Sequence, residues 1–217
     1  MAAAIIRFSD VRYGQLRRLL CYVVLMICAL QCGPVSAQQP ISQGGHGTCP
    51  VVSVRDAADA VLGAFQAKDG ERLASIVHPD KGVRFSPSAF VNVDKDVVRS
   101  RDEMKAFWTD SKLYQWGFAE GSGDPIIMTA SAYAERYIID RDFSNATSVS
   151  INGDQAVGTT KNNAADVYPM ATRVEYYIDP AVKQPAQINA WAAIRLVFEN
   201  AQGCWLLIAV IHDEWSV

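Results

Sequence analysis

The sequence predicts an α+β fold in which a sheet carries helices on one side. Up to about residue 139, apolar residues recur at helical spacing in several short segments, and after Asp142 turn-rich stretches separate runs of strand-forming residues. Helices first and antiparallel strands last are typical of this class, because the helices then cover one face of a sheet. About 167 residues follow position 50, enough for one domain around a single core.

The first helix is expected from Val54 to about residue 68. Ser53 is a suitable N-cap, and the glycine in Lys68-Asp69-Gly70 ends the pattern. The apolar residues of this segment recur every three or four positions: Val54, Ala58, Val61, Leu62 and Phe65.

Three further helices and four strands are expected. A short helix ends before His78-Pro79, another covers 101–110 behind a capping box, and a fourth covers Ala130 to Ile139. The glycine-rich stretch WGFAEGSGDPI, residues 116–126, predicts turns. The strands are expected around 149–151, 172–178, 190–199 and 204–212.

Residues 1–37 are interpreted as a signal peptide. Four arginines precede an uncharged run from Leu19 to Leu30, and Val35-Ser36-Ala37 is a suitable cleavage site. The run is shorter than the about 20 residues that cross a bilayer, which favours cleavage over a retained anchor. The Gln-, Gly- and Pro-rich residues 38–50 are interpreted as a tether, and 51–217 as the single domain.

Cleavage changes the charge and the cysteine content. Four of 20 basic and one of 23 acidic residues would be lost, leaving 16 against 22, with no basic stripe. That balance argues against nucleic acid or an anionic membrane as a partner. Only Cys49 and Cys204 would remain, and an exported chain with two cysteines predicts a disulfide between them. The alternative is that both cysteines are free thiols, with Cys204 buried and Cys49 at the surface.

The chain ends in WLLIAVIHDEWSV, where a strand runs into three titratable residues. Regular alternation places His212 and Glu214 on one face and Asp213 on the other, with the core. If Glu199 pairs with Cys204, Trp191 lies opposite His212, and Arg195 shares the face of His212 and Glu214. A two-residue slip places Trp191 opposite Glu214 instead and preserves the faces. A one-residue bulge would break this parity.

This face carries the candidate site. Arg195 could hold a ligand carboxylate, with His212 as acid, base or hydrogen-bond donor beside it. The structural alternative is that Arg195 pairs with Glu214 or Glu175 across strands. The candidate ligand-binding residues are Trp191, Arg195, His212, Glu214 and Tyr176, and the catalytic candidates are His212 and Asp213.

Neither a metal nor a cofactor is expected. Three dispersed histidines lack the spacing of a metal site. His78 with Asp80 could join His212 if the end of the second helix lay over the sheet, but capping and turn formation explain His78-Pro79-Asp80-Lys81 as well.

The order of elements resembles the nuclear transport factor two-like (SnoaL-like) cone fold over about residues 54–217. The resemblance rests on VLGAFQAKDGERLASIVHPDKGVRFSP near the start and WAAIRLVFENAQGCWLLIAVIHDEWSV at the end. The chain is also similar to uncharacterised exported bacterial proteins through several short blocks: His78-Pro79, Gly82 to Pro87, Trp116-Gly117, Gly121 to Gly123, Pro125-Ile126, Asp142-Phe143, Val167 to Pro169, and Ile211 to Asp213 with Trp215.

The resemblance implies a cone-shaped, curved antiparallel sheet with N-terminal helices packed on one face, a pocket, and often a homodimer. It implies no reaction, because this fold hosts enzymes and binding modules alike. We therefore expect an exported, periplasmic or secreted, non-enzymatic module that binds a small molecule or a protein. The alternatives are a cofactor-free isomerase, dehydratase or hydrolase, and a structural envelope protein.

Overall fold

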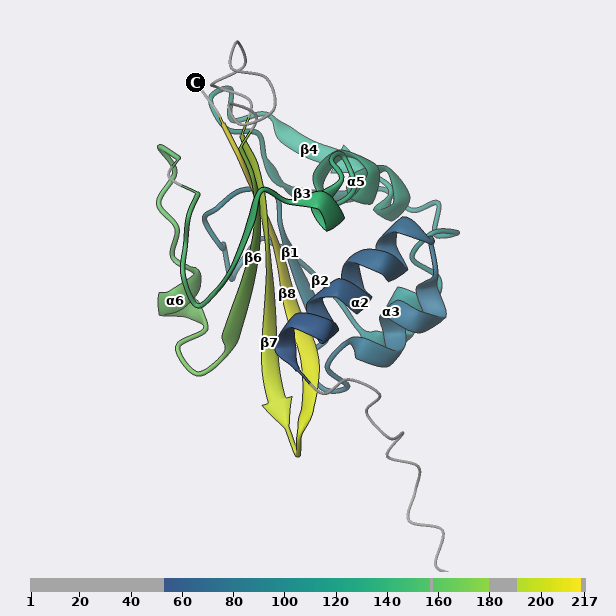
Figure 1. Ribbon diagram of the computed structural model, residues 1–217. Helices are drawn as coiled ribbons and strands as arrows, with labels where there is room; N and C mark the ends of the chain where they lie inside the picture. The colour runs from purple at the N-terminus through teal and green to yellow at the C-terminus, as the bar shows by residue number, and fades with distance from the viewer. Residues whose placement is uncertain (1–52, 157, 180–190, 216–217) are drawn as a thin grey trace, which may run out of the picture. The chain divides into compact units, whose positions relative to one another are not determined.

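The computed structural model describes residues 53–156, 158–179 and 191–215 (Figure 1). By its internal contacts the chain forms two units, Met1–Gly47 and Thr48–Val217, and every described residue belongs to the second. The expected signal peptide, the tether and Cys49 lie outside the described residues and stay predictions.

The described residues form short helices followed by a long final hairpin. The helices are α2 (Val54–Gln66), α3 (Gly70–Ile76), α4 (Arg101–Lys105), α5 (Ala130–Tyr137), the 3-10 helix η1 (Phe143–Asn145) and α6 (Ala164–Val167). The strands are β1 (Val83–Ser86), β2 (Val97–Arg99), β3 (Tyr114–Phe118), β4 (Pro125–Met128), β5 (Ser148–Ile151), β6 (Thr172–Ile178), β7 (Ala192–Ala201) and β8 (Cys204–Glu214).

The main sheet has the strand order β2-β1-β8-β7-β6-β5. All neighbours are antiparallel except β1 and β8, which run parallel. The α+β class with a large sheet and helices is thus confirmed, and β1 is the one strand that departs from a purely antiparallel arrangement among those described. A second sheet consists of β3 and β4.

Local sequence signals set most of the helix ends. Ser53 and Asp56 form a capping box at α2, and Ser100 and Glu103 form another at α4. The helix α4 ends at Lys105, earlier than predicted, and the chain continues in turns that bury Phe107. The stretch predicted as turns at 116–126 is wrong in part, because β3 and β4 pair across it and only its centre turns.

One face of the main sheet packs against α2, α3 and α5 (Figure 1). Aromatic side chains fill this layer, and Trp116 stacks on Tyr133 with ring centroids 4.0 Å apart. The buried aromatic residues there are Phe65, Phe85, Phe107, Trp116, Tyr133, Phe143, Tyr176 and Phe198. The space between helices and sheet is therefore occupied by the protein's own core.

The opposite face of the sheet is also covered in part. Ala164 of α6 packs on Val197, Ala209 and Ile211 in a second buried cluster, and Figure 1 shows α6 across the sheet from α2 and α3. The prediction that helices pack on one face of the sheet therefore holds for the N-terminal helices. The single turn of α6 covers part of the other face. Its four residues gave no helical periodicity in the sequence.

A bulge in β8 decides which side chains share a face. Val197 pairs with Ala209 and Phe198 with Leu207, so Ile208 is the extra residue. Near the turn, where Glu199 pairs with Leu206, the hairpin has the register of the two-residue slip. Beyond the bulge both predicted registers are wrong, since Arg195 lies opposite Ile211 and Ile194 opposite His212. Beyond the bulge, every side chain of β8 points to the face opposite the one predicted relative to β7.

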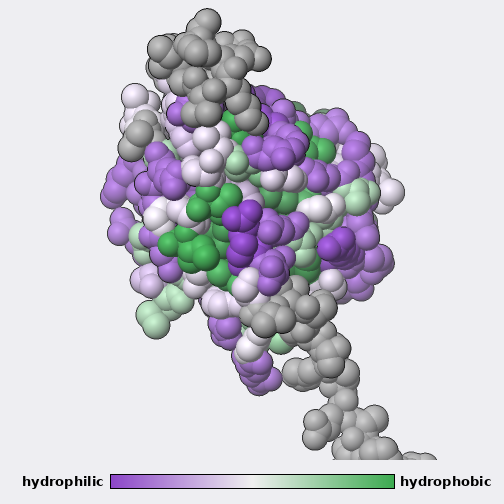
Figure 2. Space-filling view, in the orientation of Figure 1, coloured by the Kyte–Doolittle hydropathy of each residue, from purple (hydrophilic) through white to green (hydrophobic). Residues whose placement is uncertain are grey.

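The surface is largely hydrophilic in the view of Figure 2, with a compact hydrophobic patch near its centre. Several large apolar side chains are exposed over the described residues, Met170 most of all: Phe90, Val93, Val98, Leu113, Phe118, Ile127, Ile151, Met170 and Trp215. None of the helices in the described ranges combines the length and the apolar character needed to cross a membrane.

Candidate functional site

The bulge separates the residues that the sequence grouped together. His212 lies on the helix face, where its ring meets Tyr137 edge-on with centroids 5.4 Å apart. Arg195 lies on the other face and binds Asp213, with Nη2 2.9 Å from Oδ2. The predicted pairing of Arg195 with His212 and Glu214 is therefore wrong, because Ile208 shifts the alternation by one residue.

Arg195 is the centre of a buried ionic network, the Arg195 network, formed with Asp154, Glu175 and Asp213. Its side chain is fully buried, and Nε lies 2.6 Å from Glu175 Oε2 and 3.5 Å from Asp154 Oδ1. Glu175 is directly opposite Arg195 in the β6 and β7 pairing. The structural alternative for Arg195, cross-strand pairing with Glu175, is thus the one observed.

The chain after β5 covers the Glu175 side of this network, while Asp154 stays partly exposed. Glu175 Oε1 accepts hydrogen bonds from the backbone nitrogens of Gln155 and Ala156. Burial raises the pKa of Asp213, and the Arg195 guanidinium offsets part of that rise. The Arg195 side chain is fully buried and faces the protein's own carboxylates, so it does not present its charge to a ligand at the surface.

The other predicted ligand-binding residues also serve the core. The Tyr176 hydroxyl donates to Asp59 Oδ1 at 2.6 Å, which ties β6 to α2. Trp191 is almost fully buried beside Tyr177, with ring centroids 6.1 Å apart. His78 accepts hydrogen bonds at Nδ1 from the backbone nitrogens of Asp80 and Lys81, which is a turn role, and it does not join His212.

His212 instead belongs to a cluster with Asp140 and Glu214, the His212 cluster. One ligand-capable atom from each residue lies within 4.8 Å of the other two. His212 and Glu214 share a face of β8 two residues apart, and Asp140 comes from the segment after α5. No local sequence pattern points to Asp140, because it lies about seventy positions before His212 and Glu214 in the chain.

Electrostatics differ between the two carboxylates of the His212 cluster. The close approach of His212 and the hydrogen bond from Arg136 lower the pKa of Glu214 to about 2. Burial raises the pKa of Asp140, although His212 and Arg141 pull it down. Glu214 is therefore a firm anion at neutral pH, whereas Asp140 is held in a site that disfavours its charge.

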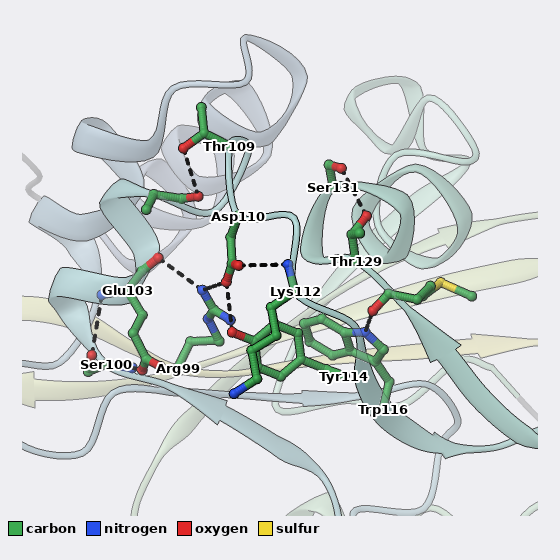
Figure 3. Close-up of polar contacts among 12 residues, drawn as sticks. Arg99, Ser100, Glu103, Thr109, Asp110, Lys112, Tyr114, Trp116, Thr129 and Ser131 are labelled. Carbon is green, nitrogen blue, oxygen red and sulfur yellow. Dashed lines mark hydrogen bonds and ion pairs between the residues drawn. The ribbon is translucent and has the colours of Figure 1, made fainter.

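A further polar cluster joins β2 to the start of β3 (Figure 3). Arg99, nearly fully buried, donates from Nη2 to Asp110 Oδ2 at 2.9 Å, and the Tyr114 hydroxyl donates to the same oxygen at 2.7 Å. Hydrogen bonds from Tyr114 and from the Lys112 backbone lower the pKa of Asp110 to about 2. The Arg99 guanidinium also lies over the Tyr114 ring. This arrangement fastens the chain after α4 to the β3 strand.

An open groove lies on the sheet face that α6 partly covers. Its volume is about 470 Å³, within the range of about 300–1,000 Å³ typical of small-molecule sites. Its lining is mainly apolar with three charged residues: Lys81, Arg84, Val98, Val167, Tyr168, Pro169, Met170, Ala171, Glu199 and Ile208. We call this feature the Arg84 groove.

The charges in the groove are unevenly neutralised. Lys81 forms an ion pair with Glu199 at 2.5 Å. Arg84 donates from Nη1 to the backbone carbonyls of Val93 and Asp96 at 3.0 and 3.3 Å, and within the described ranges no carboxylate forms an ion pair with it. The groove therefore carries one guanidinium outside any ion pair among the described residues, bonded to backbone carbonyls and lying near Tyr168 and the Asp96 carboxylate.

Sequence reasoning passed over Arg84 and Tyr168 as site residues. Both lie in short blocks that carried the family resemblance, Gly82 to Pro87 and Val167 to Pro169. The fold brings these distant blocks together at one groove. Burial raises the pKa of Tyr168, and the neighbouring Arg84 offsets part of the rise. The two blocks were the available sequence signal for Arg84 and Tyr168, but nothing in the sequence indicated that the blocks lie next to each other in the fold.

Comparison with known proteins identifies no relative. No family model matches the chain, and no curated protein matches it.

Three solved structures show a weak similarity. They are an NTF2-like designed protein (14% identity, TM-score 0.33, covering 73% of this chain and 94% of that one), a DUF4783 family protein from Bacteroides ovatus (8%, 0.32, 73% and 94%) and a chain described as a calcium/calmodulin dependent protein kinase II association domain from Xanthomonas campestris (11%, 0.33, 77% and 92%). With TM-scores this low, these similarities support no conclusion about function.

Proposed function

We propose that this protein is a non-enzymatic binding module that holds a small molecule in the Arg84 groove. The ligand would have an apolar body and an anionic group. The observation that carries the proposal is the Arg84 guanidinium, which lies in a mainly apolar groove and forms no ion pair with a carboxylate among the described residues. A charge in such a place gains most from an anion that desolvates with it.

The groove offers complementary contacts for both parts of such a ligand. Ile208 and Tyr168 supply apolar surface at the sheet and at the end of α6, and Val98 supplies it at the edge strand β2. Arg84 Nη1 is already fixed by backbone carbonyls, so the guanidinium is positioned before a ligand arrives. A preorganised cation costs less entropy on binding than a mobile one.

The wider setting belongs to the same proposal. The targeting segment supports export to the periplasm or beyond, and the order of helices and strands supports a cone-type fold of the nuclear transport factor two-like kind. The homodimer that the family resemblance implies is part of the same proposal.

The enzymatic alternative is the weaker one. His212 is 1% exposed and Asp213 is 3% exposed, so neither catalytic candidate meets the surface. Asp213 is also engaged by Arg195. Neither side chain lines the Arg84 groove.

The experiment is isothermal titration calorimetry of the full chain, which measures the dissociation constants of 4-phenylbutyrate and of the uncharged 4-phenylbutyramide. A hydrogen bond to a charged group contributes about 1.5–3 kcal/mol, so we expect the carboxylate to bind at least about tenfold more tightly than the amide. Arg84→Met should remove that preference.

Arg72→Met is the matched control, because Arg72 is an exposed arginine on α3, outside the groove. It should leave the preference unchanged. Equal binding of carboxylate and amide to the wild-type protein, or an unchanged preference in Arg84→Met, would contradict the proposal.

A further inference from the structure

The His212 cluster contains buried polar atoms that the protein does not satisfy. His212 is 1% exposed, and neither of its ring nitrogens has a hydrogen-bond partner among the described residues. Oδ1 of Asp140 is in the same condition. Each unsatisfied buried polar group costs about 1–3 kcal/mol, so the cluster favours an occupant that bonds to the imidazole and the carboxylate together.

The spacing of the ligand-capable atoms in the His212 cluster is close to that in a zinc site. Zinc binds histidine nitrogen and carboxylate oxygen at about 2.0–2.2 Å, which sets tetrahedral ligand atoms about 3.3–3.6 Å apart. His212 Nε2 lies 3.5 Å from Glu214 Oε2, and one ligand-capable atom from each of Asp140, His212 and Glu214 lies within 4.8 Å of the other two. A small movement of the Asp140 side chain would complete three corners of a tetrahedron, with the fourth left for water.

Two arginines hold the outer oxygens of the carboxylates. Arg136 Nη2 lies 2.6 Å from Glu214 Oε1, and Arg141 Nε lies 3.3 Å from Asp140 Oδ2. These contacts leave Glu214 Oε2 and Asp140 Oδ1 for the side of His212. Partners of this kind orient metal ligands in known sites. The side chains of Asp140 and Glu214 are 14% and 25% exposed, which gives an ion a route from solvent.

We propose that Asp140, His212 and Glu214 bind a divalent transition-metal ion, with Zn²⁺ the best fit to one imidazole and two carboxylates. The two guanidiniums balance the two carboxylates, so a bound dication adds net positive charge. Arg141 Nη2 also lies 3.7 Å from Glu214 Oε2, one of the oxygens that would bind the ion. Affinity is therefore limited by Arg141, and removal of its charge tightens binding.

The test is calorimetric titration of the full, metal-stripped chain with Zn²⁺, together with visible spectroscopy of the Co²⁺ form. We expect one saturable Zn²⁺ site and the intense absorption bands of tetrahedral Co²⁺ in the wild-type protein. His212→Gln and Asp140→Asn should each weaken Zn²⁺ at least tenfold, and Arg141→Gln should tighten it severalfold. His78→Gln and His46→Gln, which alter the other two histidines of the chain, should leave the affinity unchanged.

Circular dichroism separates loss of the site from loss of the fold in each variant. Asparagine has nearly the same shape as aspartate, and Asp140 lies at the rim of the cluster. Asp140→Asn therefore tests the metal site even if His212→Gln does not fold. Unchanged Zn²⁺ affinity in folded Asp140→Asn, or no saturable Zn²⁺ binding to the wild-type protein, would overturn the proposal. The Arg84 groove lies on other residues, so either result leaves the ligand proposal standing.

Discussion

Replacement of Arg195 by methionine tests the buried ionic network most sharply. Methionine has a similar length and no charge, so the change removes the guanidinium while filling much of its space. Glu175 and Asp213 then lose the group that lies 2.6 and 2.9 Å from them. Both carboxylates stay buried between the sheet and the chain after β5.

The expected loss in the free energy of unfolding is about 3–5 kcal/mol at pH 7, as for other buried ion pairs that lose one partner. A domain of this kind is stable by about 5–15 kcal/mol, so the loss is a large fraction of the total. Burial raises the pKa of Asp213 and Arg195 offsets part of that rise, so without the guanidinium the folded state takes up a proton at Asp213 more readily as the pH falls. The deficit should therefore shrink between pH 7 and pH 5.

Urea denaturation at 25 °C, followed by far-ultraviolet circular dichroism, measures this loss. Arg72→Met is the control, and as an exposed substitution it should change stability by less than about 0.5 kcal/mol. Adding Glu175→Gln to Arg195→Met should recover part of the loss, because the amide oxygen still accepts from the backbone of Gln155 and Ala156.

A loss below about 1 kcal/mol in Arg195→Met would refute the reasoning, since a solvated arginine behaves in that way. A loss that grows on acidification would refute it as well. Either result would mean that Arg195 is accessible to solvent. It would then favour the prediction from the sequence that Arg195 binds a ligand.

Three other predictions concern the hairpin and the cysteines. The pKa of Glu214 is lowered to about 2, so its carboxylate contributes stability above the unfolded value of 4.5 that disappears as the pH falls toward 2. Glu214→Gln should flatten the acid limb of the stability curve by about 1–2 kcal/mol after allowance for solvent screening, and an unchanged limb would count against it. Deletion of Ile208, the extra residue of the bulge, leaves every cross-strand pair of β7 and β8 in place, so it should cost less stability than deletion of Val210, which turns the later side chains of β8 to the other face; equal losses in the two deletions would contradict the bulge. Non-reducing mass spectrometry of exported protein should find Cys49 joined to Cys204, and two free thiols there would end the disulfide prediction.

Most of the fold follows from local signals in the sequence. Ser53 and Thr129 mark helix starts through caps that need only a few neighbouring residues. The long strands β6, β7 and β8 follow from runs of strand-forming residues. The β3 and β4 hairpin was missed because glycines dominated the stretch, although Gly117 sits within the strand with φ +148 at a shift in register.

The candidate site was harder to predict for two physical reasons. A bulge at Ile208 reverses the alternation of every later residue, and nothing in an apolar run marks which residue is the extra one. Contacts between distant segments also leave no local pattern. Arg84 meets Tyr168 in the groove, and Asp140 meets His212 beneath α5, only through the tertiary fold.

A crystal structure of the protein with 4-phenylbutyrate tests the central claim most directly. The proposal predicts the carboxylate within hydrogen-bonding distance, about 2.7–2.9 Å, of the Arg84 guanidinium, with the phenyl ring against Ile208 and Tyr168. An empty groove at saturating ligand would contradict it, as would a carboxylate bound at another residue.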